Sequence, residues 1–428
     1  MIKISRIEFF VFWCIVLIQS LVWSRFLLAV GIGGIVVIAL CQIPKEKGEK
    51  MTIFEWIFHY LQFWTWRKST PQYGTNFFRN KSFLALSIPF LLVFISGLWS
   101  DDLRYWLSRV QLRLPFLLIP FAFSQIPPLS KKQIQGLLLA FLGIISINLL
   151  LVLINYAFDF DNINTKIGQG TAMPFLKMHI TFSVMAAFAV CAGIELWLSR
   201  FFIRYKWEKP LIAFLTVFTF IGLHIIAVRT GLIALYLCLI LRGGILIFQN
   251  RQYILGFSSL ILLLAIPLAA YQFVPSFQQR VNYAVWDFEQ YKMGDPDNKS
   301  DSERLISLKM GGQIFSDNKI WGVGYGDILQ KSERFYTEHY PNLTAKLPHN
   351  QWLLTAMGLG LMGLLASIVA FFLPLLEQQR FRNFTFAGLH LLIFVFCMTD
   401  IPFEGTFSLV FYSFFASLFL NVDAINEK

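Results

Sequence analysis

The sequence predicts an all-α polytopic membrane protein whose helices cross the bilayer about twelve times. Hydrophobic residues make up 56% of the 428 residues and charged residues only 14%, whereas an ordinary globular domain contains about 25% charged residues. The apolar residues gather in runs close to the length of about 20 residues that a membrane-spanning helix needs. Because backbone groups in lipid must be hydrogen-bonded within the protein, such runs favour helices over open sheets.

Twelve apolar segments are the candidate spans of a single membrane domain, residues 1–428. They cover residues 9–23, 26–43, 83–99, 112–123, 134–158, 178–198, 210–228, 231–248, 254–271, 351–376, 386–398 and 406–420. A shorter segment, residues 51–66, is apolar and aromatic but contains Glu55 and His59. For this segment we expect an interfacial helix whose tryptophans lie at the level of the lipid headgroups.

The basic residues predict how the chain is oriented. Most lysines and arginines between the spans fall on one side of the membrane if both termini are cytoplasmic, as the positive-inside rule requires. The formal net charge of +11 is therefore a topology signal, and it does not indicate nucleic-acid binding, because no basic patch lies on a soluble domain. The polar interval of residues 272–350 then lies outside the cytoplasm, between the ninth and tenth spans.

Residues 272–350 have the composition of a folded, partly helical loop that caps an active site. Acidic and basic side chains are nearly balanced there. Asp301 and Ser302 are favourable helix N-caps and apolar residues follow with helical spacing, which places Arg304 in the first turn of a helix. Three glycines within residues 321–327 predict a tight turn, but they lack the context of a Rossmann or Walker motif.

Cysteine and histidine spacing gives no indication of a metal site or a disulfide framework. The five cysteines include no CxxC pair, and no histidines have the spacing of a helical zinc site. We therefore expect neither metal nor cofactor. His179, His224 and His390 stand singly in or near spans, where a hydrogen bond to a neighbouring helix is the expected role, and His339 is expected to be a solvated loop residue.

Two arginines and one histidine are the candidates for chemistry on a charged substrate. Arg229 ends an apolar run at the outer membrane face, where the alternative is an arginine that only marks the interface. Pro348 favours a helix start, so His349 would lie near a helix dipole that disfavours its charged form. Guanidinium groups bind phosphate oxygens through paired donors. Arg229, Arg304 and His349 together predict a diphosphate site, with His349 as a base or as a diphosphate ligand.

Five further residues are candidate substrate contacts. Arg280 is a second possible diphosphate ligand, Asn350 follows His349, and Tyr325 lies in the glycine-rich turn. Asp400 and Glu404 lie in the outer turn between the last two spans, where their carboxylates can orient an arginine or the acceptor.

The order of these motifs resembles that of the O-antigen ligase and O-antigen polymerase superfamily. The resemblance rests on Arg229-Thr230-Gly231 at a span end, Arg304 early in a loop helix, the glycines of residues 322–326, and the Leu-Pro-His-Asn of residues 347–350 leading into Gly358-Leu359-Gly360. It covers residues 229–363 in motif and most of the chain in topology. It implies a bacterial inner-membrane enzyme that transfers a glycan from undecaprenyl diphosphate at the periplasmic face, without a metal, with His349, Arg229 and Arg304 as catalytic residues.

Within this resemblance we favour a ligase whose acceptor is lipid A core. An O-antigen polymerase or a protein O-oligosaccharyltransferase would share the donor and differ in the acceptor. If His349 removes the proton of an acceptor hydroxyl, the displacement inverts the anomeric centre. The alternative of another class is a flippase or transporter for lipid-linked sugars. Carriers tend to place ionisable groups near the middle of spans, whereas the charges here lie at span ends and in one loop.

Overall fold

Apolar helices, most of them joined by short turns, account for most of the chain. The structure is a computed structural model that describes residues 3–40, 51–52, 75–174, 178–248, 251–293 and 300–422. Its elements up to the middle of the chain are β1 (Lys3–Ile4), α1 (Arg6–Trp23), α2 (Arg25–Leu40), β2 (Met51–Thr52), α4 (Thr75–Arg79), α5 (Lys81–Ile95), η2 (Ser96–Leu98), α6 (Leu103–Arg113), α7 (Pro115–Ser124), α8 (Lys131–Phe158), α9 (Phe160–Gly168) and α10 (His179–Leu198).

The second half of the chain continues the helix bundle and adds the helices of the long loop. Its elements are α11 (Glu208–Ile226), α12 (Arg229–Phe248), α13 (Tyr253–Phe273), α14 (Pro275–Lys292), α15 (Ser300–Asp317), α16 (Ile328–His339), α17 (Gln351–Leu376), η3 (Glu377–Arg382), α18 (Phe384–Thr399), η4 (Pro402–Glu404) and α19 (Thr406–Leu420). The polar interval between α13 and α17 contains the helices α14, α15 and α16, and its place outside the cytoplasm stays a prediction.

Polar side chains cap several of these helices at the positions where they begin. Ser5 and Glu8 form a capping box at α1, and Ser130 and Gln133 form another at α8. Such a box satisfies two backbone N–H groups that have no partner within the helix. The prediction for the loop was wrong in detail, because Asp301 and Ser302 lie within α15.

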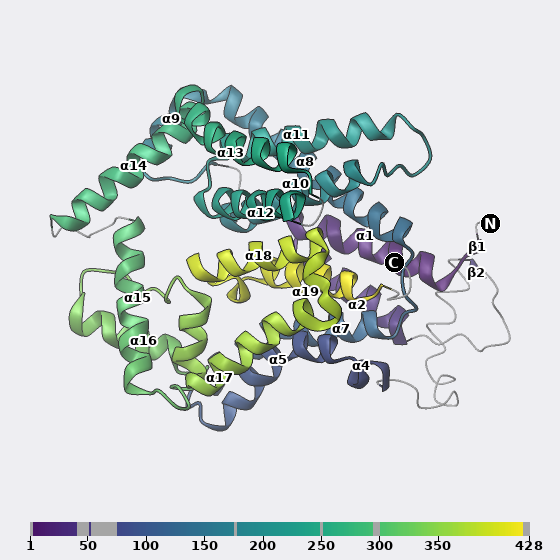
Figure 1. The fold of residues 1–428 in the computed structure, drawn as a ribbon. Helices are drawn as coiled ribbons and strands as arrows, with labels where there is room; N and C mark the ends of the chain where they lie inside the picture. The colour runs from purple at the N-terminus through teal and green to yellow at the C-terminus, as the bar shows by residue number, and fades with distance from the viewer. Residues whose placement is uncertain are drawn as a thin grey trace.

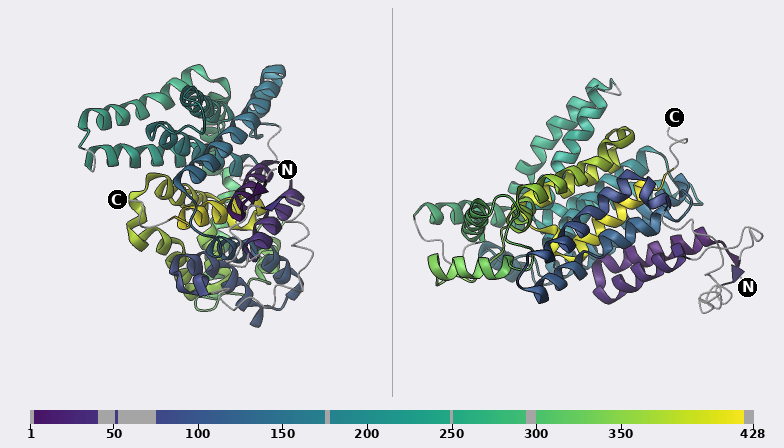
Figure 2. Two further views of the ribbon diagram at one scale, coloured as in Figure 1. Left: turned by 90° about the vertical axis from the view of Figure 1, so that its right-hand side faces the viewer. Right: turned by 90° about the horizontal axis from the view of Figure 1, so that it is seen from below.

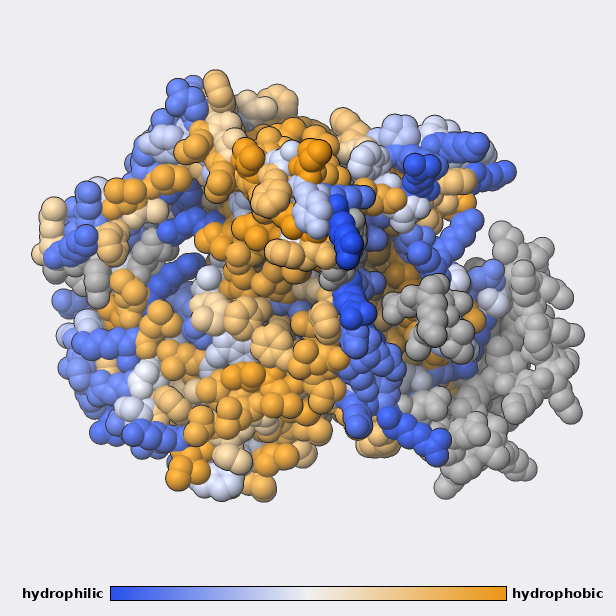
Figure 3. Space-filling view, in the orientation of Figure 1, coloured by the Kyte–Doolittle hydropathy of each residue, from blue (hydrophilic) through white to orange (hydrophobic). Residues whose placement is uncertain are grey.

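The described chain has the polarity of a membrane protein. The apolar helices run side by side, with α14, α15 and α16 at one end and the N-terminus at the other (Figures 1 and 2). On the face shown in Figure 3, a broad hydrophobic region lies between hydrophilic residues over these loop helices and hydrophilic residues toward the opposite side. We call the end that carries α14–α16 the loop end of the bundle.

The number of spans is confirmed only in part. Each of the twelve predicted segments coincides with an observed helix. Among the described residues, however, only eight helices are long and apolar enough to cross a membrane. The helices α2, α18 and α19 are apolar but have 15 or 16 residues, and α7 has 10. The chain is thus an all-helical membrane protein apart from the antiparallel pair β1 and β2, and the figure of twelve stays a prediction. Most of the proposed interfacial helix, residues 53–66, lies outside the described residues.

The helices α10 and α13 mark the centre and the periphery of the bundle. α10 packs against α8, α11, α12 and α18. Within its most apolar stretch of 18 residues, 78% of the residues are buried. α13 packs mainly against α12 and α14. Only 12% of the residues in its corresponding 18-residue stretch are buried. The first residue of α10 is therefore held at the middle of the loop end.

The glycine-rich turn after α15 closes onto a break in α17. The backbone N–H groups of Val323 and Gly324 donate to the carbonyls of Met357 and Gly358, each at 3.0 Å. At the break Gly360 has φ +66°, and a Cβ there would lie 2.0 Å from the carbonyl oxygen of Ile320. The tight turn predicted from the sequence is confirmed, and it fixes the loop directly to the helix that begins just after His349.

Candidate functional site

The Arg-Thr-Gly motif begins α12 and joins that helix to two others. Arg229 is the first residue of α12. Thr230 accepts a hydrogen bond from Thr399 of α18 at 3.4 Å. A Cβ at Gly231 would lie 2.6 Å from the side chain of Ser183 in α10, so only glycine allows the two helices this approach. The motif thereby sets Arg229 over the beginning of α10.

His349 is held between the loop and the last two helices. Its backbone N–H donates to Ser307 Oγ at 3.3 Å, and Ser307 Oγ donates to the carbonyl of Arg304 at 2.7 Å. The next residues bind the turn after α18, since the Gln351 N–H donates to the Asp400 carbonyl at 3.1 Å. Arg304 and His349 are thus positioned by the same segment of α15.

Asn350 caps α17 rather than facing the candidate site. Its side-chain oxygen accepts from the Leu353 N–H at 3.0 Å, and its amide donates to the Met398 carbonyl at 3.3 Å. The helix therefore begins at Gln351, three residues after Pro348, and the expectation that Pro348 lies within its first turn was wrong. A substrate contact by Asn350 has no support from its place in the structure.

The predicted catalytic residues line one cavity at the loop end, of about 520 Å³. We call it the arginine cavity. Its lining residues are Gln169, Gly170, Thr171, Ala172, His179, Ile180, Val228, Arg229, Thr230, Arg280, Tyr283, Glu303, Arg304, Lys346 and His349. Four basic side chains and one acidic side chain thus face the same space. The Arg280 Nη1 donates to the Gly170 carbonyl at 3.0 Å, which fixes its guanidinium at the wall.

His349 is paired with Asp400. The His349 Nδ1 lies 3.2 Å from Asp400 Oδ1, and the two side chains are 25% and 18% exposed. Burial raises the pKa of Asp400, but the hydrogen bond and charge of His349, the Ile401 N–H and the charge of Arg304 lower it by more, so the pKa lies below its ordinary 3.8. Because an ionised carboxylate only accepts, this contact places a hydrogen on His349 Nδ1.

An apolar groove opens beside the arginine cavity and shares two arginines with it. The groove has a volume of about 600 Å³. It is lined by Ala227, Arg229, Leu232, Ile233, Tyr236, Pro267, Phe277, Arg280, Val281, Ala284, Val285, Phe288, Glu289 and Lys292. Arg229 and Arg280 therefore stand where a polar space meets an apolar one, between α12, α13 and α14.

A further cavity lies on the other side of His179, between the start of α10 and the turn from α18 to α19. Its volume is about 310 Å³. Its lining residues are Met178, His179, Ile180, Thr181, Phe396, Asp400, Ile401, Pro402, Glu404, Gly405 and Ser408. We call it the carboxylate cavity, because Asp400 and Glu404 are its acidic residues and none of the described lysines and arginines lines it. It shares His179 and Ile180 with the arginine cavity.

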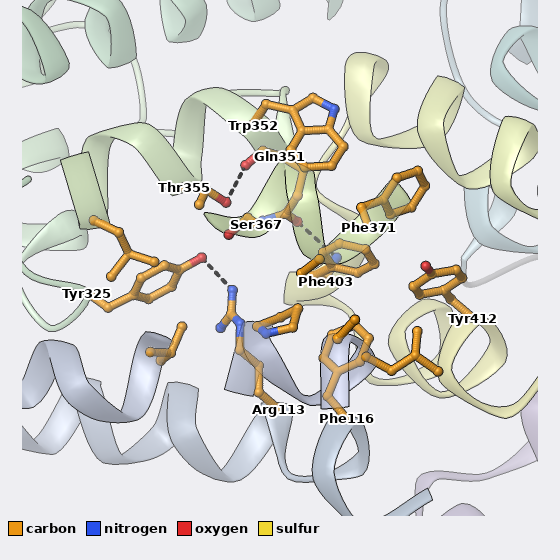
Figure 4. Close-up of a pocket in the computed structure, with 16 residues that line it drawn as sticks. Arg113, Phe116, Tyr325, Gln351, Trp352, Thr355, Ser367, Phe371, Phe403 and Tyr412 are labelled. Carbon is orange, nitrogen blue, oxygen red and sulfur yellow. Dashed lines mark hydrogen bonds between the residues drawn. The ribbon is translucent and has the colours of Figure 1, made fainter. Parts of the chain in front are cut away.

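Tyr325 and Glu404 belong to a buried network that the sequence did not predict. The Tyr325 hydroxyl donates to Glu404 Oε1 at 2.8 Å, and Arg113 donates to both Tyr325 and Glu404. Arg109 adds an ion pair to Glu404 at 3.3 Å. Figure 4 shows Tyr325 and Arg113 meeting beside a small interior cavity of about 30 Å³, lined mainly by apolar and aromatic residues. Tyr325 does not line the arginine cavity, and Glu404 reaches only the carboxylate cavity.

His179 is the residue of the site that sequence reasoning missed. His224 and His390 have the expected hydrogen bonds to neighbouring helices, to Tyr236 of α12 at 2.7 Å and to Tyr412 of α19 at 3.4 Å. None of the residues that the structure describes hydrogen-bonds the imidazole of His179, which lines both polar cavities. A lone histidine in or beside an apolar run looks the same in sequence in all three cases. Among the described residues no cluster of three or more possible metal ligands occurs.

The comparison with protein families agrees with this placement. Residues 214–368 match the family model described as O-Antigen ligase. The match covers 155 of the 428 residues, and we call residues 214–368 the ligase domain. The resemblance to the O-antigen ligase and polymerase superfamily is thereby confirmed. No curated protein matches the chain.

The ligase domain contains the loop end and its basic residues. Arg229, Arg280, Arg304 and His349 all lie within residues 214–368. His179, Asp400 and Glu404 lie outside this range, so the site of the ligase domain is completed by helices that precede and follow it. The match supports the assignment of residues 214–368 to the O-antigen ligase and polymerase superfamily.

Proposed function

We propose that this protein is an O-antigen ligase that transfers a glycan from undecaprenyl diphosphate to a hydroxyl of lipid A core, at the periplasmic face of the bacterial inner membrane. The observation that carries the proposal is the meeting of Arg229, Arg280, Arg304 and His349 in one cavity, with His349 paired to Asp400 behind it. A diphosphate leaving group develops negative charge, and fixed cations in a water-poor cavity stabilise that charge.

The apolar groove supports a lipid-linked donor. It shares the lining residues Arg229 and Arg280 with the arginine cavity. A diphosphate at these two arginines would leave a prenyl chain in the groove and the glycan in the arginine cavity. Both parts of such a donor would therefore find surroundings of matching polarity.

His349 is the proposed general base. The acceptor hydroxyl attacks the anomeric carbon as His349 Nε2 takes its proton. The glycosidic bond forms while the bond to the diphosphate oxygen breaks, with inversion at that carbon. Asp400 accepts the hydrogen bond from Nδ1 and stabilises the imidazolium that results, as a carboxylate does in other histidine pairs. The diphosphate leaves with its charge on the arginines.

The reaction is tested with purified protein in detergent. Wild-type protein should join a glycan from undecaprenyl diphosphate to purified lipid A core, with the product identified by mass spectrometry. If the glycan is transferred only to a second lipid-linked glycan, the protein is a polymerase. If it is transferred only to a hydroxyl of a polypeptide, the protein is a protein O-oligosaccharyltransferase. Movement of the lipid-linked glycan across liposomes without any transfer would favour a carrier.

The role of His349 is separated from simple diphosphate binding by steady-state kinetics. A base acts on the chemical step, so His349→Ala should lower kcat and leave the KM for the lipid-linked donor near its wild-type value. A raised donor KM with little change in kcat would instead make His349 a diphosphate ligand.

A further inference from the structure

We infer that the carboxylate cavity receives the acceptor sugar, so that acceptor and donor enter the reaction from opposite sides of His349 and His179. This inference rests on the proposed function and adds the place and chemical class of the second substrate. It starts from the two polar cavities, which share the wall formed by His179 and Ile180.

The two cavities differ in charge. The arginine cavity is lined by Arg229, Arg280, Arg304 and Lys346, with Glu303 as its one acid. Among the described residues, the carboxylate cavity is lined by Asp400 and Glu404 and by no lysine or arginine. Arg109 and Arg113 offset the charge of Glu404. A diphosphate is therefore attracted to the first cavity and finds no cation in the described lining of the second. A neutral polyol suits the second, because carboxylates accept hydrogen bonds from hydroxyl groups.

The position of the base links the two spaces. His349 lines the arginine cavity, while its partner Asp400 lines the carboxylate cavity. A hydroxyl that comes from the carboxylate cavity therefore meets the His349–Asp400 pair before it meets the arginines. It approaches the anomeric carbon from the side away from the diphosphate, as an inverting displacement requires.

The wall of the carboxylate cavity is preorganised to bind a sugar ring. Glu404 is fixed by Arg109, Arg113 and Tyr325. Phe396 and Ile401 offer apolar surface for the carbon face of a ring. With about 310 Å³, the cavity is at the lower end of the range of small-ligand sites, about 300–1,000 Å³. It therefore fits one or two sugar units that carry the reacting hydroxyl, and the rest of the acceptor would stay outside.

Two matched tryptophan variants test the assignment. Thr181 lines only the carboxylate cavity and Ala172 lines only the arginine cavity. In the transfer assay with purified lipid A core, Thr181→Trp should raise the KM for lipid A core by about tenfold and leave the KM for the undecaprenyl-diphosphate glycan within about twofold. Ala172→Trp should do the reverse. Met178→Trp, which fills the carboxylate cavity from another position, should reproduce the effect of Thr181→Trp.

The melting temperature in detergent is the control for folding, and Thr181→Trp and Met178→Trp protein should melt close to wild type. A normal KM for lipid A core in both folded variants, or a raised donor KM alone, would overturn the inference while leaving the proposed function intact. Absence of transfer in wild type would instead refute the proposed function.

Charge selectivity gives an independent test. Lipid A core whose terminal sugar is phosphorylated should accept the glycan at least about tenfold less efficiently than the neutral form, because the cavity offers it the Asp400 carboxylate and no lining cation. Equal kcat/KM for the two acceptors would contradict the assignment.

Discussion

Two arginine and carboxylate centres lie near the loop end, and they differ in access. In one, Arg113 and Glu404 are 3% and 7% exposed and are closed off by Tyr325 and Arg109. In the other, Arg229, Arg280 and Arg304 surround an open cavity beside His349 and Asp400. The closed centre stabilises the fold by holding α6, the glycine-rich turn and η4 together. The open centre leaves room for an anionic substrate, so cavity and burial, more than residue type, separate binding from structure.

The largest expected difference between the two centres is the effect of losing the proposed base. His349→Ala should lower kcat for transfer by about 10²–10⁴-fold, the usual contribution of general base catalysis. His339→Ala is the control, because His339 is a helix-end histidine that bonds the carbonyl of Phe335 at 3.1 Å and lines neither cavity. Normal transfer by His349→Ala protein would remove His349 from the mechanism.

Loss of the Asp400 carboxylate is expected to have the second-largest effect on transfer. Asp400→Asn keeps the shape but can present an amide N–H to Nδ1, which favours the tautomer with the hydrogen on Nε2. We expect kcat to fall by about 10²-fold or more while the melting temperature changes little. A pH–rate profile should show the loss at every pH, since Asp400 in the wild type stays ionised below its ordinary pKa. Wild-type activity in the variant would make Asp400 a structural residue only.

Arg304→Lys should have a smaller effect on transfer. Lysine keeps the charge but loses the paired donors that bind phosphate oxygens, so we expect kcat/KM to fall by about 10- to 100-fold. Arg334→Lys is the matched control, because Arg334 is an exposed loop arginine paired with Glu338 at 2.9 Å. Equal activity of the two variants would place Arg304 among the surface charges.

A substitution in the closed centre should lower the stability of the folded protein. Arg113→Met leaves Glu404 in a buried site with fewer partners, and breaking such a pair costs about 3–5 kcal/mol. We expect a clearly lower melting temperature in detergent, with partial recovery in the double variant Arg113→Met/Glu404→Leu, which removes both charges. A single variant as stable as wild type would show that the network contributes no net stability.

The pH dependence of stability gives the smallest expected signal. Burial raises the pKa of Glu404, but Arg113, the hydrogen bond from Tyr325 and Arg109 lower it by more, so it lies below the ordinary 4.5. A lowered carboxyl pKa stabilises the folded state above the unfolded-state pKa, and this stabilisation is lost as the pH falls through the folded-state pKa. Glu404→Gln protein should therefore be less stable than wild type at pH 7, with a gap that narrows below about pH 4.5. A stability difference between the two proteins that does not change with pH would show that ionisation of Glu404 is not linked to folding.

The sequence predicted the open centre better than the closed one. Arg229, Arg304 and His349 could be named because each ends or begins an apolar run or a loop helix, and such positions gather at one membrane face. Asp400 and Glu404 could not be told apart, since both lie in the same short turn and only packing turns them in different directions. Tyr325 was predicted to contact substrate, yet its hydroxyl is satisfied by Arg113 and Glu404.

The positions of the apolar helices were predicted well for a simple physical reason. Their lengths were predicted less well. Apolar runs in lipid have no alternative to helix, so each predicted segment coincides with an observed helix. The sequence did not show that α17 breaks at Gly360, because a single glycine in an apolar run is compatible with a straight helix. The break depends on a backbone contact with Ile320, 40 positions earlier in the chain.

That contact between the turn and α17 determines which amino acid changes this family of sequences could accept over evolution. Gly322, Gly324 and Gly360 all have φ between +66° and +87°, and a methyl group at each would overlap neighbouring atoms. Any replacement there acts on the backbone itself, so size or polarity of the new residue hardly matters. A saturation library should therefore be depleted of every non-glycine codon at these three positions and far more permissive at Val323 between them.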